Sequence, residues 1–280
     1  MNDTPIDLEA YLRRIGFDGA PTPTLDVLGR LIERHASTIP FENIDVLAKR
    51  VPSLDLAALQ RKLVQHRRGG YCFEQGSLFG AALRQAGFIV HGLEARVRAG
   101  VPADRITGRT HMALRVTLDN VDYLVDVGFG GQAPLAPLKL GMAGPQAAAG
   151  SVYRLADADG GSLLQLETHD GWIDCYLLAR TEPQRIDYEL ANWYVATHPQ
   201  AMLGNNLLTG RVVPGGRLTL FNRQLTMRPH GSGKADEKTV QSRAELADVL
   251  ADGFGLDIDA ADLDSLMGVI ERSSADGWPR

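Results

Sequence analysis

The stretch THMALRVTLDNVDYLVDVGF, from Thr110 to Phe129, decides the fold of this chain. Its residues alternate in polarity on both sides of Asp119 and Asn120, a pair that is typical of a two-residue hairpin loop. With that loop, Leu118 lies opposite Val121 and the two strands pair in antiparallel fashion. The stretch therefore predicts a β-hairpin and, with it, an antiparallel sheet.

The same pairing predicts which side chains share a face of the hairpin. It continues to Ala113 opposite Asp126, which places His111 diagonal to Asp126 and on the same face. Diagonal cross-strand Cβ atoms lie about 7 Å apart, within reach of a ring and a carboxylate that lean toward each other. A four-residue loop keeps the shared face, whereas a three-residue loop breaks it because a one-residue slip turns the side chains to the opposite side.

The first 86 residues have the spacing of amphipathic helices. The first predicted helix stops at Gly16, and the second follows Thr24 as its N-cap. A third follows Ser53 or Asp55, and a fourth begins at Cys72. This part of the chain is therefore expected to form a helical unit.

After Gly87 the pattern changes to alternating, β-branched segments punctuated by turn residues, which predicts further antiparallel strands. These segments are FIVHGLEARVRAG, VYRLADADGGSLLQLETHDGWIDCYLL and GRLTLFNRQLTMRP. The tail returns to helical spacing behind a capping box from Ser242 to Glu245. Helices, then antiparallel strands, then helices again predict an α+β fold.

Composition narrows the classes of partner and compartment. Of the 280 residues 44% are hydrophobic and 22% charged, and the net charge is -5. No apolar run approaches the roughly 20 residues that span a bilayer, so no membrane span is expected. The charges are interspersed and form no basic stripe, so nucleic acid is not an expected partner. The first residues have no apolar signal region, which leaves the cytoplasm as the expected location; the oligomeric state cannot be read from the sequence.

No metal site is expected. Asp257, Asp259 and Asp262 resemble a calcium loop only faintly, because the sixth and twelfth positions of that loop are not the Gly and Glu that it requires. The glycine-rich GFGG at 128–131 lacks the pattern of a dinucleotide fingerprint. The chain's two cysteines have neither zinc-site spacing nor the number of a disulfide scaffold, so both are expected to be free thiols.

Cys72 lies in HRRGGYCFEQGSLFG (66–80), at the start of the predicted fourth helix. Gly69 and Gly70 allow a sharp turn and a close approach to a ligand, and the helix start directs unpaired N–H groups at the sulfur. Both favour a thiolate. Arg67 and Arg68 either add to this stabilisation or are solvated charges on the surface. The alternative is a small buried residue.

A thiolate nucleophile needs an imidazole beside it, and the imidazole needs an orienting carboxylate. The hairpin supplies His111 and Asp126 on one face, so with Cys72 they form a candidate triad. Without Cys72, the pair would equally fit a structural hydrogen bond within a sheet. The other histidines are isolated in the sequence, and Cys175 is expected to pack in a strand.

Four motifs in the same order resemble the arylamine N-acetyltransferases. They are IPFENIDV at 39–46, RGGYCFEQ around Cys72, THMALRV around His111 and VDVGFGG around Asp126. The resemblance runs from YLRRIG near the start to LFNRQLTMR near Phe221 and becomes weaker in the last residues.

The resemblance implies a helical bundle (1–86) that carries the nucleophile, an antiparallel β-barrel (87–190) that carries His and Asp, and a C-terminal α/β lid (191–280). It implies that Cys72, His111 and Asp126 act as a triad like that of cysteine proteases and transglutaminases. It also implies acetyl-CoA as donor and an arylamine, arylhydrazine or arylhydroxylamine as acceptor, by a ping-pong route through an acetyl-cysteine. The matching substrate-pocket positions are Phe41, Val97, Thr110, Phe129 and Gly130.

The chain departs from the family pattern at Gly76, where the motif usually has Asn. Glycine in a helix costs about 1 kcal/mol relative to Ala, so this position needs a reason. Three alternatives stay open at this point: a thiol hydrolase (amidase or peptidase) with the same triad, a polyketide amide synthase, and a non-catalytic binding module.

Overall fold

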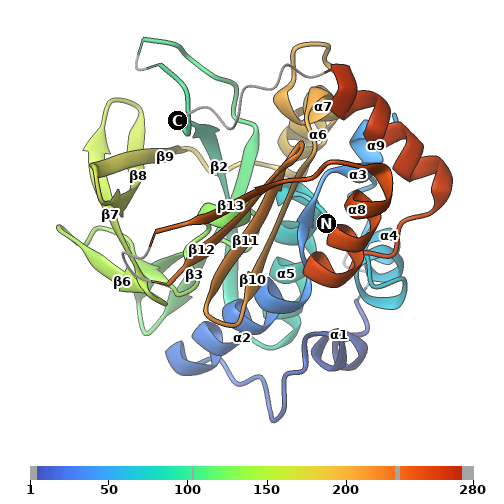
Figure 1. Cartoon of the computed structure of the whole chain (residues 1–280). Helices are drawn as coiled ribbons and strands as arrows, with labels where there is room; N and C mark the ends of the chain where they lie inside the picture. Colours follow the sequence, from blue (N-terminus) through green and yellow to red (C-terminus); the bar gives the residue numbers. More distant parts are fainter. Residues whose placement is uncertain (1–4, 103, 231–233, 273–280) are drawn as a thin grey trace.

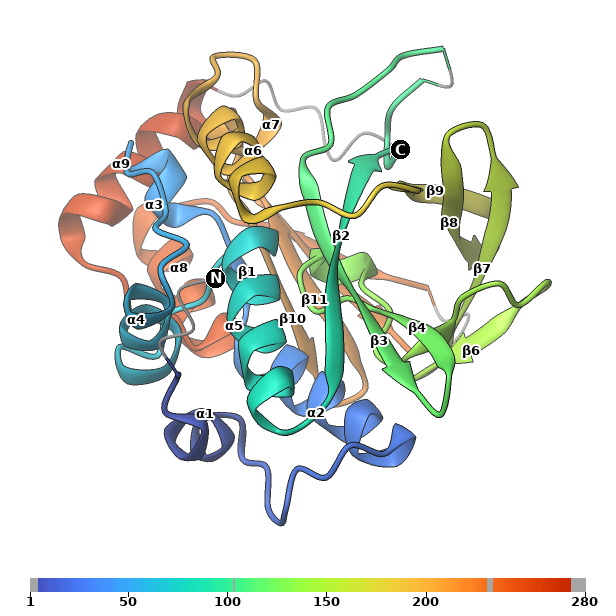
Figure 2. The same cartoon turned by 180° about the vertical axis from the view of Figure 1, so that it is seen from behind.

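A computed structural model describes residues 5–102, 104–230 and 234–272 and combines helices with two antiparallel sheets (Figures 1 and 2). The helices and helical turns are α1 Leu8–Ile15, α2 Leu25–Thr38, α3 Ile44–Leu47, α4 Leu56–Leu59, η1 Gln60–Gln65, α5 Cys72–Gln85, η2 Gly130–Gln132, α6 Arg185–Thr197, α7 Met202–Asn205, α8 Arg243–Asp248, η3 Val249–Gly253 and α9 Ala260–Arg272. The strands are β1 Phe41–Glu42, β2 Ile89–Val97, β3 His111–Leu118, β4 Val121–Val125, β5 Leu138–Lys139, β6 Gln146–Ala148, β7 Ser151–Ala158, β8 Gly161–Thr168, β9 Gly171–Ala179, β10 Leu208–Val213, β11 Gly216–Phe221, β12 Gln224–Pro229 and β13 Asp236–Thr239. The α+β prediction is confirmed.

Strands β3 and β4 form the predicted hairpin, with Leu118 paired to Val121. Asp119 and Asn120 have φ angles of 50° and 60°, the left-handed conformation that a tight two-residue turn requires. The ladder ends one pair earlier than expected, at Leu114 opposite Val125. The prediction that it reaches Asp126 is therefore wrong by one pair, and that carboxylate lies just beyond the strand, where a side chain can reorient.

Eight antiparallel strands, in the order β5-β4-β3-β2-β9-β8-β7-β6, curl into a nearly closed barrel (Figures 1 and 2). The edge strands β5 and β6 are joined by the Gln146 side chain, which accepts the Lys139 N–H at 2.7 Å and donates to its carbonyl oxygen at 3.0 Å. These bonds close part of the gap that the backbone ladder leaves. The interior is filled by buried side chains that include Ala113, Leu124 and Tyr153.

Helix α5 packs against the outer face of β2 and β3. Met112, Leu114 and Val116 point to the helices, whereas Ala113 points into the barrel. Both faces of β3 are thus buried. The predicted alternation holds, with one set of side chains in the core shared with the helices and the other in the core of the barrel. The helix that begins at Cys72 is in this way fixed to the strand that begins at His111.

The predicted helix signals hold in the amino-terminal part. Gly16 ends α1 with a φ of 63°, and the Thr24 hydroxyl accepts the Val27 N–H at the start of α2. Of the two proposed caps for the third helix, Asp55 accepts N–H groups of α4. The two-residue strand β1, which pairs with β10, was not predicted, because two residues are too short to show a period.

The second sheet, β1-β10-β11-β12-β13, lies between two cores. Leu208 and Phe221 pack toward α5 and its neighbours, while Leu207 and Leu220 pack toward α3, α8 and α9. The division into 1–86, 87–190 and 191–280 stays a proposal. The strand pair β1–β10 joins the first range to the third, and α6 runs across residue 190.

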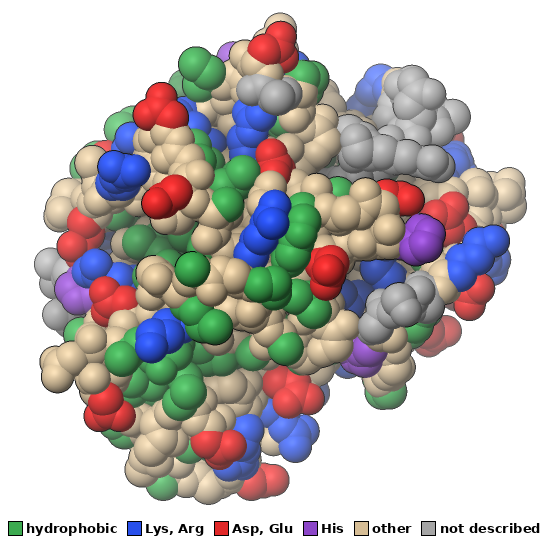
Figure 3. All heavy atoms as spheres, turned by 90° about the vertical axis from the view of Figure 1, so that its left-hand side faces the viewer, with side chains coloured by type: hydrophobic (Ala, Val, Ile, Leu, Met, Phe, Trp, Pro, Cys, Tyr) green, Lys and Arg blue, Asp and Glu red, His purple; other side chains and the backbone are tan. Residues whose placement is uncertain are grey.

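Figure 3 shows the barrel side of the molecule, where acidic and basic side chains are interspersed with hydrophobic ones. Within 5–102, 104–230 and 234–272, helices are too short or too polar to cross a bilayer.

Candidate active site

Cys72 is the first residue of α5 and is buried, with 4% of its surface exposed. The loop after β4 passes directly over it. A Cβ atom at Gly128 would lie 2.7 Å from the Cys72 Cα atom, closer than such atoms approach in proteins. Only glycine fits at residue 128 with Cys72 in this place, so the VGFGG segment is shaped around the cysteine.

His111 and Asp126 form a buried pair, with His111 Nε2 2.7 Å from Asp126 Oδ2. The other carboxylate oxygen, Oδ1, accepts the Gly128 N–H at 2.8 Å, which holds the carboxylate in place. The Cys72 side chain contributes to raising the pKa of His111, and its sulfur lies 3.7 Å from the Thr110 carbonyl oxygen. Because Nε2 is taken by Asp126, Nδ1 is the nitrogen available to Cys72.

The surroundings of His111 favour its protonated form. Burial lowers its pKa, but the Asp126 charge and the hydrogen bonds with Asp126 and Cys72 outweigh burial and raise it to about 10. Cys175, by contrast, is fully buried in β9, as expected, and burial raises its pKa to about 12. The chain thus has one cysteine next to a cationic ring and one that stays a neutral thiol.

Two aromatic rings hold the imidazole. The ring centroids of Phe129 and Tyr176 lie 4.9 Å and 4.8 Å from that of His111. The Tyr176 hydroxyl is buried without a hydrogen-bond partner among the described residues; burial first, and then the Asp126 charge, raise its pKa. A side chain that could donate to Asp126 after a small movement therefore lies beside the pair.

Tyr176 was missed by sequence reasoning because a β-bulge interrupts β9. Leu164 pairs with Tyr176 and Gln165 with Asp174, so Cys175 is an extra residue in the ladder. Cys175 and Tyr176 both pack in the barrel core, whereas simple alternation would direct consecutive side chains to opposite faces. The sequence carries no signal for this bulge.

Of the five predicted pocket residues, two contact Cys72 or His111 directly. Thr110 contributes the carbonyl near Cys72, and Phe129 packs on His111. Val97 pairs with Tyr176 at the end of β2. A Cβ at Gly130, whose φ is 58°, would lie 3.8 Å from the Phe41 ring, so these two also face each other.

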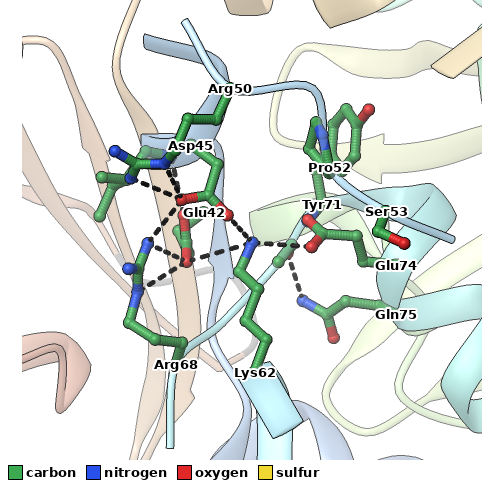
Figure 4. Close-up of polar contacts among 12 residues, drawn as sticks. Glu42, Asp45, Arg50, Pro52, Ser53, Lys62, Arg68, Tyr71, Glu74 and Gln75 are labelled. Carbon is green, nitrogen blue, oxygen red and sulfur yellow. Dashed lines mark hydrogen bonds and ion pairs between the residues drawn. The ribbon is translucent and has the colours of Figure 1, made fainter. Parts of the chain in front are cut away.

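Gly69 and Gly70 have a different reason from the one expected. A Cβ at Gly69 would lie 2.2 Å from the Pro40 carbonyl oxygen, and one at Gly70 would lie 2.8 Å from Glu74 Oε2. The two glycines thus let the chain pass close to its own neighbours. Arg68 likewise points to Glu42, 2.9 Å away, so it does not act as a solvated charge (Figure 4).

Gly76 has a steric reason. It faces β3, and a Cβ there would lie 3.1 Å from both Cγ and Sδ of Met112. The Met112 side chain therefore fills the space that a side chain at residue 76 would need. The unexplained glycine belongs to the contact between α5 and the strand that carries His111.

Chemically, the arrangement joins a sulfur nucleophile, an imidazole able to move a proton, and a carboxylate that orients the ring. Within the described part of the chain, no group of three or more His, Cys, Asp or Glu side chains could hold a metal ion. Asp259 instead accepts the Asp262 N–H, and Asp262 pairs with Arg50.

Comparison with known proteins gives consistent results. A family model described as N-acetyltransferase matches residues 24–263. The arylamine N-acetyltransferase of Mycobacterium tuberculosis H37Rv is 39% identical over 258 residues, which cover 90% of each chain. That of Escherichia coli K12 is 39% identical over 259 residues, covering 92% of this chain and 91% of the other. The solved structure of Mycobacterium marinum arylamine N-acetyltransferase in complex with CoA matches with a TM-score of 0.88 at 36% identity, covering 95% of this chain and 99% of that one.

Proposed function

Because this chain belongs to the arylamine N-acetyltransferase family, an enzyme family, we propose that it moves the acetyl group of acetyl-CoA to an arylamine, arylhydrazine or arylhydroxylamine. The observation that carries the proposal is the buried His111–Asp126 pair next to Cys72. A solved relative in complex with CoA supports the donor. The acceptors are small aromatic amines and hydrazines.

The proposed route is ping-pong. The Cys72 thiolate attacks the thioester carbonyl carbon, the bond to the CoA sulfur breaks, and CoA leaves with the proton of the His111 imidazolium. In the second half, the amine nitrogen attacks the acetyl-cysteine while His111 accepts its proton. The thiolate and imidazolium are thereby restored, and the products are CoA and the acetylated amine.

Asp126 keeps the imidazole in position and offsets its charge during both halves. The oxyanion that forms at the carbonyl is placed near the Cys72 backbone N–H, which at the first residue of a helix has no intrahelical partner. Phe41 and Phe129 would form aromatic walls for the acceptor ring, together with Val97, Thr110 and Gly130. We further propose that residues 191–280 form the lid over this site. The proposed location of the protein is the cytoplasm.

The test supplies acetyl-CoA with an aromatic hydrazine and measures released CoA thiol and acetylated product together. CoA release should depend on the hydrazine, and without it mass spectrometry should find one acetyl group on Cys72 and none on Cys175. Equal CoA release with and without the hydrazine would identify a thiol hydrolase. No turnover of acetyl-CoA with any aromatic amine or hydrazine would leave the amide synthase or the binding module.

A further inference from the structure

Glu74 lies in the first turn of α5, two residues after Cys72, and only 1% of its surface is exposed. Its carboxylate makes two different contacts. Oε1 lies 2.7 Å from Lys62 Nζ of η1, and Oε2 accepts the backbone N–H of Tyr71 at 3.1 Å. One side chain therefore connects a neighbouring helical turn to the residue that precedes the nucleophile (Figure 4).

Lys62 is the centre of this arrangement. Its Nζ atom also lies 2.6 Å from Asp45 Oδ2 and 4.0 Å from Glu42 Oε1, and its side chain is 17% exposed (Figure 4). Burial alone would lower its pKa, but these carboxylates outweigh burial and raise it. Lys62 is thus a permanent cation held by three elements of the chain.

The backbone is shaped around this carboxylate. A Cβ at Gly70 would lie 2.8 Å from Glu74 Oε2 and 2.9 Å from Glu74 Cβ, so a side chain at residue 70 would displace the carboxylate from the Tyr71 N–H. Gln75, the next residue, donates to the Gly70 carbonyl at 2.9 Å and to the Pro40 carbonyl at 3.1 Å. Consecutive side chains of α5 therefore fix the loop immediately before Cys72.

The charge on Glu74 is finely set. Burial raises its pKa, and the Glu42 charge of β1 adds to this, while Lys62 of η1 and the Tyr71 N–H lower it; the result is about 7. Asp45 of α3 and Arg68 act one step further out, through Lys62 and Glu42. A protonated Glu74 accepts fewer hydrogen bonds, so the link between Lys62 and Tyr71 is complete only when the carboxylate is ionised.

We propose that Lys62 and Glu74 are positioning residues for Cys72: Lys62 holds the Glu74 carboxylate over the start of α5, where it fixes the Tyr71 N–H and so the place of the nucleophile. The inference rests on the proposed role of Cys72. A nucleophile displaced by about 1 Å can lose about 100-fold in rate, so a link this close to Cys72 controls the acetylation step.

The experiment measures the rate of Cys72 acetylation by acetyl-CoA, without acceptor, across pH 6 to about 8.5 by rapid-quench mass spectrometry. Glu74→Gln keeps the shape and an oxygen for Tyr71 but turns a neutral amide toward Lys62. We expect it to acetylate about 10- to 100-fold more slowly at the upper end of this range, with the KM for acetyl-CoA unchanged. In the wild type, ionisation of Glu74 should make the acetylation rate rise near neutral pH. This rise should be absent in Glu74→Gln.

Lys62→Met should move that rise to higher pH, because a carboxylate without its cation ionises less readily. In Lys62→Met the Glu74 carboxylate is left without its cation. Adding Glu74→Gln removes that unpaired charge, so the double variant should recover part of the acetylation rate that Lys62→Met loses. The control is the Lys238–Glu245 pair at the surface, whose side chains are 64% and 25% exposed, and where Lys238→Met and Glu245→Gln should change neither rate nor pH profile.

A Glu74→Gln variant that keeps the wild-type rate and pH profile would overturn the inference. If Lys62→Met does not fold, the isosteric Glu74→Gln decides alone. Failure of the proposed function is distinguishable, since wild-type protein would then carry no acetyl group on Cys72.

Discussion

Two buried polar clusters lie on opposite sides of the start of α5, and they differ in how completely their groups are paired. In the proposed triad, a single ion pair of 2.7 Å joins His111 and Asp126 beside Cys72, and the walls are aromatic. In the ion cluster, which we define as Glu42, Asp45, Lys62, Arg68 and Glu74, each carboxylate meets a cation and a second donor or cation.

The difference separates rigidity from reactivity. A fully paired polar cluster in a low-dielectric interior strongly prefers one geometry, so the ion cluster forms a frame for the loop before Cys72. The proposed triad leaves the Cys72 sulfur with weak partners, and a weakly bonded sulfur is free to react. A change at Cys72 should therefore act mainly on rate, whereas changes at the buried His111–Asp126 pair or at the contacts that hold Cys72 should act on rate and stability together.

The largest effect is expected for Cys72→Ala, which removes the nucleophile. Acetyl transfer from acetyl-CoA should be abolished, while the free energy of unfolding changes by about 1 kcal/mol or less because a single small atom is lost from the core. Activity assays and urea unfolding check the two parts. Cys175→Ala is the matched control and should keep full activity; residual acetyl transfer by the Cys72 variant would contradict the triad.

Asp126→Asn should lower kcat/KM by about 100- to 10,000-fold, because the imidazole loses its orienting charge. It should also destabilise the fold by about 3–5 kcal/mol, since His111 is left buried without a counter-charge. Here the triad and its stability are coupled. Steady-state kinetics and urea unfolding of the same preparation test both, and unchanged stability would show that the pair is less buried than the structure has it.

The pH dependence of that variant follows from the raised pKa of His111. A histidine whose pKa rises from 6.5 to about 10 on folding adds stability that is complete below pH 6.5 and is lost as pH rises through 10. The stability difference between wild type and Asp126→Asn should therefore shrink as pH increases over this window. Urea unfolding at several pH values measures it, and a difference that grows with pH would contradict the sign.

Gly128→Ala should disrupt the contact between the loop after β4 and Cys72. The added Cβ would lie 2.7 Å from the Cys72 Cα atom, where backbone and not a flexible side chain has to move. We expect a loss of about 1–3 kcal/mol in unfolding free energy together with a lower rate of Cys72 acetylation. Wild-type values for both would mean that loop and helix move apart at little cost.

The hairpin and the helix signals could be predicted from the sequence because they are local. The Asp119–Asn120 loop determines the parity that puts His111 and Asp126 on one face, whether the ladder ends at Val125 or one pair later. Thr24 and Asp55 cap helices through hydrogen bonds to residues two or three positions away. Such features depend on residues that are close together in the sequence, so the sequence alone is enough to predict them.

Tyr176 and the ion cluster could not be predicted, because they depend on packing. Tyr176 reaches His111 only through the bulge at Cys175, which changes the parity of β9. The ion cluster joins Glu42, Lys62 and Glu74 from three separate elements, and in the sequence each of them resembles an ordinary surface charge. These side chains come together because η1, β1 and α5 pack against one another, and residue spacing in the sequence does not predict that packing.

The smallest effect is expected at Gly76, on the contact between α5 and β3. Alanine in a helix is favoured over glycine by about 1 kcal/mol, but at residue 76 its Cβ would lie 3.1 Å from Met112. Methionine is flexible, so its side chain can shift by a few tenths of an ångström. The two effects oppose each other, and Gly76→Ala should change the unfolding free energy by less than about 1 kcal/mol.

Gly29→Ala in α2 is the matched control, because the nearest side-chain atom to its Cβ would be 3.9 Å away. It should gain the full helix preference of about 1 kcal/mol, so the gap between the two variants measures what the Met112 contact costs. Met112 follows His111 directly in β3, which makes the rate of Cys72 acetylation a second readout. Equal gains in stability for both variants, with no change in rate, would mean that Met112 moves freely and that the glycine at residue 76 is not needed to hold α5 against the strand of the triad.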